Sequence, residues 1–489
     1  MLLIPFIFLA SCSNEYNVTI YGYDGEIIKL KTNSKINLDS ITYPDFYELD
    51  GLYTSTDYDT KFNIEEDVKS DLTLYVAFKN KIELSKINDI DNIDLTNYID
   101  NLIKNTSSYI PSWNKEGFKG RWNYIDGVFL KSIIELYKKT NNNKYKDFVI
   151  KYVNYYLDQE GNFINPKTNE YSFNSGELDS ICESNILFDL YNYTNDIKYL
   201  NAIEKTYTEL KKVPKTINNI NYSHKSSYLN QIWLDGMYMY VPFLIKYANL
   251  KNNLDIYNEI KAQYEYIKAN MYDEKYKLYY HGHDTTKSIF WANSKTGNSK
   301  SFWLRSMGWY ILSLADSIEL INDNNLKSYL NDLLKEALNN LLMYKDIKTN
   351  LYYNLINKGN LAINVFDTYF EGLGNKNYQL NNKYVTRTIN NYLEASGSAM
   401  ISYALLKAAR INNNESFKTE GKKTFEGVYS YLFDGINLNN ICITAGLGPQ
   451  SKPYRDSSLM YYLAETKGIN DAKGVGPFIM AYIEYKYNN

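Results

Sequence analysis

The chain has 489 residues, with 53 Lys and Arg against 56 Asp and Glu, and a formal net charge of -3. Its pI is near 5.9, and its Lys residues are scattered among Asp and Glu rather than gathered into a basic stripe. We therefore expect no nucleic-acid partner, and a length that allows an enzyme-sized domain with an accessory domain.

The N-terminus begins with a short apolar run that ends at Cys12. The run is too short to span a bilayer but suits the core of a secretory leader. Leu9-Ala10-Ser11-Cys12 resembles a bacterial lipobox, which implies cleavage before Cys12 and lipidation of its thiol. We expect a signal peptide over residues 1–11 and a lipid-anchored protein at the bacterial cell surface or in the periplasm. A buried N-terminal strand is the alternative.

No later segment has the uninterrupted apolar length of a membrane helix, so the lipid anchor is the only expected membrane contact. The other two cysteines, Cys182 and Cys442, are far apart and lack metal-ligand spacing. We interpret both as buried small apolar side chains.

Residues 12–82 differ in pattern from the rest. Residues 16–23 alternate with the period of a strand, and residues 72–78 form a β-rich run. The order Gly51-Leu52-Tyr53-Thr54, Lys61-Phe62 and Asp71 to Tyr75 resembles the Listeria–Bacteroides repeat of bacterial surface proteins. We therefore expect a small β-grasp-like module in this stretch.

Residues 83–489 show helical periodicity with a recurring polar phrase. Residues 136–145 and residues 190–199 have similar sequences, and each of these polar motifs lies between two amphipathic stretches. Similar pairs of stretches follow through residues 243–267, 307–342 and 396–432. Repeated helical hairpins bury their apolar faces by stacking. The length and the number of hairpins favour a closed α/α ring, so the chain is expected to be mainly α.

Chemistry-bearing residues cluster in the middle of the chain. All three His residues lie between His224 and His283, and four of the six Trp residues lie in or just after that stretch. Asp235 stands in the apolar run Gln231 to Met239, where the charged form of a carboxyl is disfavoured, as suits a general acid. A helix N-cap is the alternative role for this aspartate.

Several ordered motifs resemble glycoside hydrolase family 105, the unsaturated rhamnogalacturonyl hydrolases, which are related to the family 88 unsaturated glucuronyl hydrolases. They are Leu178-Asp179-Ser180-Ile181, His224-Lys225, Gln231 to Met239, Tyr279 to Asp284, Trp291-Ala292-Asn293, Phe302 to Tyr310, Tyr392 to Ser396, Arg455-Asp456 and Lys473 to Phe478. The likeness spans about residues 110–487. It implies an (α/α)6 barrel, in agreement with the hairpin repeat.

The resemblance also implies an activity. Such enzymes release a 4,5-unsaturated uronic acid from the end of pectin-derived oligosaccharides by hydrating its enol ether double bond. Asp235 would protonate C4 and activate the water that adds at C5, so no separate nucleophile is needed. Asp179 matches the family's second acidic residue, for which a helix cap is the alternative. No cofactor is required.

Substrate-binding roles follow from the same resemblance. His224 and His281 match pocket histidines, and Arg305 suits a uronate carboxylate because its planar fork matches two oxygens. An arginine that ties neighbouring helices together is the alternative. The remaining expected contacts are Lys225, Trp233, Trp303, Trp309 and Tyr124, of which Tyr124 is also compatible with a core position.

Two positions depart from the family pattern, since Ser184 and Ser457 stand where glycine is common. Three other interpretations fit parts of the sequence. The histidines with an Asp suggest a metal site, but their spacing fits no standard pattern, and we expect none. A non-catalytic surface adhesin is the second alternative, and hydrolysis of glucuronyl glycosaminoglycan or ulvan fragments is the third. We expect a monomer.

Overall fold

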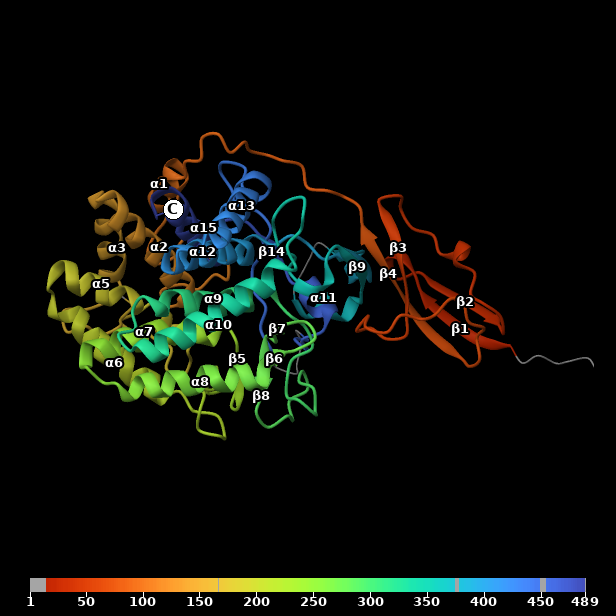
Figure 1. Cartoon of the computed structure of the whole chain (residues 1–489), viewed down its shortest axis with the longest axis horizontal. Coiled ribbons are helices and arrows are strands. Elements are labelled where there is room, and N and C mark those ends of the chain that lie inside the picture. The colour runs from red at the N-terminus through yellow and green to blue at the C-terminus, as the bar shows by residue number, and fades with distance from the viewer. Residues whose placement is uncertain (1–14, 166, 374–377, 449–453, 489) are drawn as a thin grey trace, which may run out of the picture. The chain divides into compact units, whose positions relative to one another are not determined.

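The computed structural model describes residues 15–165, 167–373, 378–448 and 454–488 (Figure 1). The predicted leader and Cys12 lie outside these residues. The chain divides into two compact units, one of Met1–Glu83 with Asn360–Asn390 and one of Leu84–Gly359 with Asn391–Asn489. Within the described part of the chain, no helix is both long and apolar enough to cross a membrane.

The first unit is a sheet in the order β12-β9-β4-β1-β2, with β3 also paired to β4. Its N-terminal strands, red to orange in Figure 1, are β1 (Tyr16–Tyr21), β2 (Ile27–Thr32), β3 (Tyr47–Tyr53) and β4 (Leu72–Asn80). β1 runs antiparallel to β2 and parallel to β4. Alternate residues such as Ile20, Leu74 and Val76 are fully buried, as the period of two predicted. The likeness to the Listeria–Bacteroides repeat stays a prediction.

One segment differs from the boundary predicted at residue 83. The strands β9 (Leu361–Val365) and β12 (Arg387–Asn390) join the sheet of the first unit, with α11 (Asp367–Leu373), β10 (Gln379–Leu380) and β11 (Lys383–Tyr384) between them. β9 pairs antiparallel with β4, opposing Ile363 to Ala77. The physical reason is burial, because Ala362 and Ile363 are fully buried in the paired strand.

The second unit is an (α/α)6 barrel, as predicted. Its inner helices are α2 (Tyr124–Thr140), α4 (Asp179–Cys182) with α5 (Asn185–Thr194), α7 (Gly236–Lys251), α9 (Leu304–Ile318), α12 (Ala395–Asn412) and α15 (Ala472–Ile483). Each of these helices contacts the next, and α15 contacts α2, which closes the ring. The outer helices are α1 (Thr96–Lys104), α3 (Asn143–Asn154), α6 (Ile197–Lys212), α8 (Asp255–Met271), α10 (Asn324–Leu342) and α13 (Glu415–Leu432).

The recurring polar phrase is the turn of each hairpin. In four of the hairpins the inner helix ends at an Asn in the left-handed conformation, namely Asn141, Asn195, Asn252 and Asn413. Asn tolerates this conformation better than most residues. In three of them the next residue caps the outer helix with its side chain, namely Asn142, Asp196 and Asn414. The repeated sequence therefore ends the inner helix and begins the outer helix at adjacent residues.

The inner helices pack closely because glycines stand at their contacts. A Cβ at Gly127 would lie 2.5 Å from the Cα of Glu183, and one at Gly476 would lie 2.9 Å from the carbonyl oxygen of Val128. Every residue of α9 and of α15 is buried. Helices buried all round in this way can form only the inner layer of the ring.

Candidate active site

A cavity of about 130 Å³ lies where the inner helices begin. Tyr124 and Asp179 open α2 and α4, whereas Asp235 directly precedes α7 and Trp303 precedes α9. The positive ends of several helix dipoles therefore meet at this end of the ring, which favours an anionic ligand. The cavity brings together every predicted site residue of the barrel except His281, which lies behind Asp235.

Asp235 presents an unsatisfied carboxylate oxygen. The residue stands at the N-cap position of α7, but its side chain makes no capping hydrogen bond. Its Oδ2 lies 3.1 Å from Nε2 of His281, yet neither atom has hydrogen-bond geometry to any described residue. A buried polar atom without a partner is costly unless a ligand or water satisfies it. This geometry favours the catalytic role of Asp235 over the cap.

His281 is held from its other side. Its ring is fully buried, and Nδ1 lies 2.6 Å from the hydroxyl of Tyr462. Its backbone carbonyl accepts a hydrogen bond from Leu234 N at 2.8 Å, next to Asp235 in sequence. The contact with Tyr462 couples the two ring nitrogens: when the hydroxyl donates to Nδ1 of the neutral ring, the ring proton lies on Nε2 and faces Asp235. Nothing in a single sequence with 51 Tyr distinguishes Tyr462.

Asp179 has a different environment. Its Oδ1 lies 3.3 Å from Nε2 of His224, and its Oδ2 lies 2.9 Å from Nζ of Lys225. Burial opposes ionisation, but the charges of Lys225 and His224 outweigh it and hold the pKa of Asp179 well below its ordinary value. The sequence left a helix cap as an alternative, but the side chain binds these two residues. Asp179 is therefore a carboxylate at any working pH.

Aromatic rings form the walls of the cavity. Trp233 stacks on His224 with ring centroids 4.3 Å apart and on Tyr228 at 5.1 Å. Trp309 stacks on Tyr238, and Trp303 donates from Nε1 to Asn354 at 3.0 Å. All three tryptophans are buried and line the cavity, in positions suited to the faces of a sugar ring.

Arg305 lines the cavity but is already engaged. Its Nη1 donates to the carbonyl of Cys442 and its Nη2 to the carbonyl of Ile443, 3.3 Å away. Glu394 binds the same strand from its other side, accepting from Cys442 N at 3.1 Å. The sequence predicted that Arg305 holds a substrate carboxylate. In the structure its fork holds β13 (Ile441–Cys442), close to the alternative of a structural arginine.

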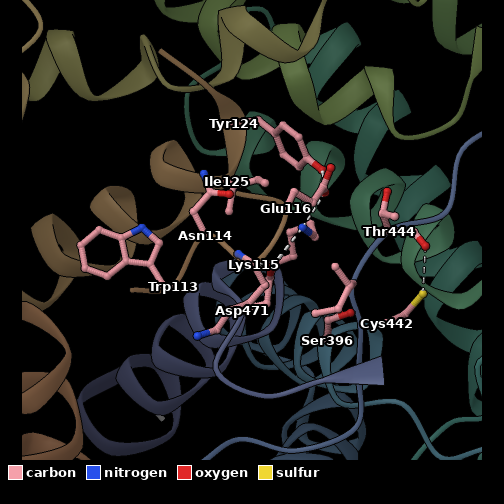
Figure 2. A network of polar contacts seen from close by, with 12 residues as sticks. Trp113, Asn114, Lys115, Glu116, Tyr124, Ile125, Ser396, Cys442, Thr444 and Asp471 are labelled. Atoms are coloured by element: carbon pink, nitrogen blue, oxygen red, sulfur yellow. Dashed lines mark hydrogen bonds and ion pairs between the residues drawn. The ribbon is translucent and has the colours of Figure 1, made fainter. Parts of the chain in front are cut away.

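Glu116 was not predicted and lies on the cavity wall. Its Oε1 accepts from the hydroxyl of Tyr124 at 3.1 Å (Figure 2). The same oxygen accepts from Lys473 Nζ at 2.7 Å. Lys473 also lies 3.1 Å from Asp471 and is 1% exposed. Burial alone would raise the pKa of Glu116, but Lys473 reverses this and lowers it. Tyr124 is therefore held at the cavity through Glu116.

Arg455 also lines the cavity, although only its resemblance motif was noted in the sequence. A Cβ added at Gly446 would lie 2.9 Å from Nη1 of Arg455 and 3.3 Å from the ring of Trp233. The glycine thus lets the guanidinium approach the wall beside Asp235. Rarity was the one available signal, since Arg is an uncommon residue in this chain.

The two serines that replace common glycines are accommodated by hydrogen bonds. Ser457 has a φ of 60°, which disfavours a side chain. Its Oγ accepts from Lys300 N at 2.9 Å and donates to the carbonyl of Trp291 at 2.8 Å. Ser184 Oγ bonds Trp122 Nε1 at 3.0 Å and Thr206 Oγ1 at 2.9 Å. Both side chains therefore fit the local loops.

The histidines do not converge as metal ligands. His283 contacts Asn298 through Nδ1 at 2.8 Å and Tyr266 through Nε2 at 3.3 Å. His224 and His281 face different aspartates. Among the described residues, no three His, Cys, Asp or Glu side chains lie together as a metal site requires.

A second cavity, of about 560 Å³, lies in the same unit among the later turns of inner helices. Its polar side chains pair with one another. Asp316 accepts from Lys131, from Lys407 at 2.8 Å and from the hydroxyl of Tyr403 at 2.6 Å. Cations near the C-terminal ends of helices complement the helix dipoles, so this network stabilises the ring.

Comparisons with known proteins agree with this architecture. A family model described as Glycosyl Hydrolase Family 88 matches residues 98–369 and 362–488. A solved glycoside hydrolase from family 105 of C. acetobutylicum ATCC 824 is 32% identical with a TM-score of 0.65, covering 80% of this chain and 98% of that chain. Protein Atu3128 of Agrobacterium fabrum is 28% identical over 256 residues, 50% of this chain and 97% of that protein. Unsaturated rhamnogalacturonyl hydrolase YesR of Bacillus subtilis is 22% identical over 352 residues, 69% of this chain and 92% of that protein.

Proposed function

Because the chain belongs to the glycosyl hydrolases of families 88 and 105, we propose that it removes a terminal 4,5-unsaturated galacturonic acid from rhamnogalacturonan oligosaccharides. In this proposal Asp235 is the catalytic acid and base, and Asp179 supports the unsaturated ring or its water. The substrate is a pectin fragment, and the reaction is hydration of the enol ether.

The unequal environments of the two aspartates carry the proposal. Asp179 is held as a carboxylate and engaged by Lys225, 2.9 Å away, and by His224. Asp235 lines the cavity without a cation beside it, and its buried Oδ2 has no hydrogen bond and lies 3.1 Å from Nε2 of His281. Ordinary glycosidases need a second carboxyl free to act as nucleophile or base. A single available carboxyl suits hydration, in which one group gives a proton and then takes one back.

The proposed reaction balances with one water. Protonated Asp235 gives its proton to C4, which leaves positive charge shared between C5 and the ring oxygen. Water adds at C5 as the Asp235 carboxylate takes its proton. The resulting hemiketal opens to a ketone at C5, and C1 then expels the next sugar as an alcohol and becomes an aldehyde. Asp179, as a fixed negative charge, stabilises the positive charge on the ring.

The choice of substrate rests on the family likeness and on YesR, whose name states rhamnogalacturonyl hydrolysis. A panel of lyase-generated disaccharides tests it, with loss of the ultraviolet absorbance of the conjugated double bond as the readout. The highest kcat/KM is expected for unsaturated galacturonyl-rhamnose. A preference for glucuronyl glycosaminoglycan or ulvan fragments would replace the pectin substrate, and no turnover on any of them would favour the surface adhesin.

We also propose a lipid anchor at Cys12, which lies outside the described residues. Two or more acyl chains give stable membrane attachment. Mass spectrometry of the protein from its native host is expected to find a diacylated Cys12 at the mature N-terminus. An unmodified Cys12 within an intact N-terminus would exclude the anchor.

A further inference from the structure

The substrate of the proposed function carries one carboxylate, and the cavity must supply a cation for it. Among the residues that the structure describes, three permanent cations line the cavity, namely Lys225, Arg305 and Arg455. A cation that already binds a carboxylate or a carbonyl has fewer N–H donors left for a ligand, because each donor serves mainly one acceptor. Their existing partners therefore decide which of them is available.

Two of the three cations are engaged. Lys225 lies 2.9 Å from Asp179 and 3.2 Å from Glu177. Arg305 donates from both terminal nitrogens to backbone carbonyls and is 1% exposed. Moving either side chain onto a ligand would leave buried oxygens without donors, which is unfavourable for each oxygen left unpaired.

Arg455 is the cation with free donors. Its Nε is buried without a hydrogen-bond partner, and the guanidinium forms no ion pair with any residue in the described part of the chain. Among the carboxyls, Glu465 has the largest electrostatic effect on Arg455. Burial raises the pKa of Glu465 to about 7, so that carboxyl is only partly ionised near neutral pH.

The position of Arg455 also suits a carboxylate at C5. A Cβ added at Gly446 would contact both Nη1 of Arg455 and the ring of Trp233, so these two groups lie close to the same point. Trp233 is two residues from Asp235 in the sequence. In the unsaturated uronate the carboxylate is bonded to C5, adjacent to the C4 that receives the proton. A group that fixes the carboxylate near Trp233 therefore fixes C4 near Asp235.

We propose that Arg455, rather than Arg305, binds the carboxylate of the unsaturated uronic acid, resting on the proposed function for the identity of that ring. Arg305 instead positions β13 at the cavity wall. Arg455 makes a charge-assisted contact through its planar fork, and Gly446 provides the space that the guanidinium occupies.

A cycle of enzyme variants and substrate esters tests this assignment. Arg455→Met is assayed on unsaturated galacturonyl-rhamnose as the free acid and as its methyl ester. We expect kcat/KM for the acid to fall roughly ten- to a hundredfold, with the ester changed less than about twofold. Arg455→Lys should recover part of the loss on the acid, because it restores the charge without the fork.

Arg305→Met is the matched comparison. It should slow both substrates by the same factor and lower the melting temperature, because it releases β13. An equal loss on acid and ester in Arg455→Met, or no loss on either, would overturn the assignment. Failure of the wild-type enzyme to act on the acid would instead contradict the proposed function, so the two failures are distinguishable.

Discussion

At the scale of residues, the site depends on two aspartates whose side chains have different contacts. Asp235 directly precedes an inner helix and Asp179 begins another, and neither uses its side chain as a cap. Asp179 binds the cations beside it, whereas Asp235 keeps an oxygen unbonded next to His281. Identical side chains thus acquire separate tasks from their neighbours.

Asp179→Asn should lower kcat on the order of a hundredfold, because the fixed negative charge beside the reacting ring is lost. Glu177→Gln is the matched control, since Glu177 holds the same Lys225, 3.2 Å away, without lining the cavity. We expect little change in kcat there. Steady-state kinetics on both variants check this, and equal losses would mean that Asp179 acts only by holding Lys225.

Much of this site could be predicted from sequence, because the motif around Asp235 is apolar and distinctive and the histidines cluster beside it. Glu116 and Tyr462 could not be, since each belongs to a common residue type far from the motif in sequence. The backbone contacts of Arg305 could not be predicted either. The sequence shows a suitable fork but not the backbone carbonyls of residues 442 and 443 that occupy it.

At the scale of elements, inner helices cross so closely that two acids become buried together. Asp126 of α2 and Glu183 after α4 are each 1% exposed. Burial raises the pKa of Asp126 to about 6. Burial and the neighbouring Asp126 raise the pKa of Glu183 well above its ordinary value. The helical hairpins themselves were predictable from their Asn turns, whereas this pair was not, because it arises between hairpins.

A pH dependence of stability follows from the raised pKa values. The folded state holds protons that the unfolded chain releases near pH 4, so stability is full below that pH and falls as the pH rises through about 6. Glu183→Gln removes one such acid and keeps an acceptor for Asn123 N, 2.6 Å away. Its gain in stability over wild type should grow steadily between pH 4 and pH 8, because the buried acid of the wild type must ionise there at a cost.

Thermal or urea unfolding across this range measures the effect. Glu26→Gln, at an exposed carboxyl of the first unit, is the control and should show no such trend. A stability difference between Glu183→Gln and wild type that does not vary with pH would show that Glu183 is not an acid with a raised pKa.

At the scale of the whole molecule, the first unit is built from two separated parts of the chain. The strand β9 could not be assigned from sequence, because four apolar residues and Asn364 within a helical domain match no period that identifies their partner. The inserted segment 360–390 can nevertheless be removed from the chain by design. Asn391 Nδ2 donates to the carbonyl of Gly359 at 2.8 Å, so the ends of the inserted segment lie side by side within the barrel unit.

Deleting residues 15–83 alone should give an aggregating protein, because β9 loses its partner β4 and exposes Ile363 on an open edge. Deleting residues 15–83 and replacing 360–390 with a short linker should leave a monomeric barrel with wild-type kcat on the disaccharide. Size-exclusion chromatography and kinetics compare the two. Loss of activity in the double deletion, despite correct folding, would show that the first unit takes part in catalysis.

The central claim is that Asp235 protonates C4 of the unsaturated ring. Its most direct test is a reaction in D₂O, in which mass spectrometry and NMR follow deuterium at C4 of the released keto acid, with preformed product in D₂O as the exchange control. Wild type should place one deuterium at C4 at the rate at which the chromophore is lost, and folded Asp235→Asn should do neither. Turnover by Asp235→Asn near the wild-type rate, or wild-type product without deuterium at C4, would contradict the account.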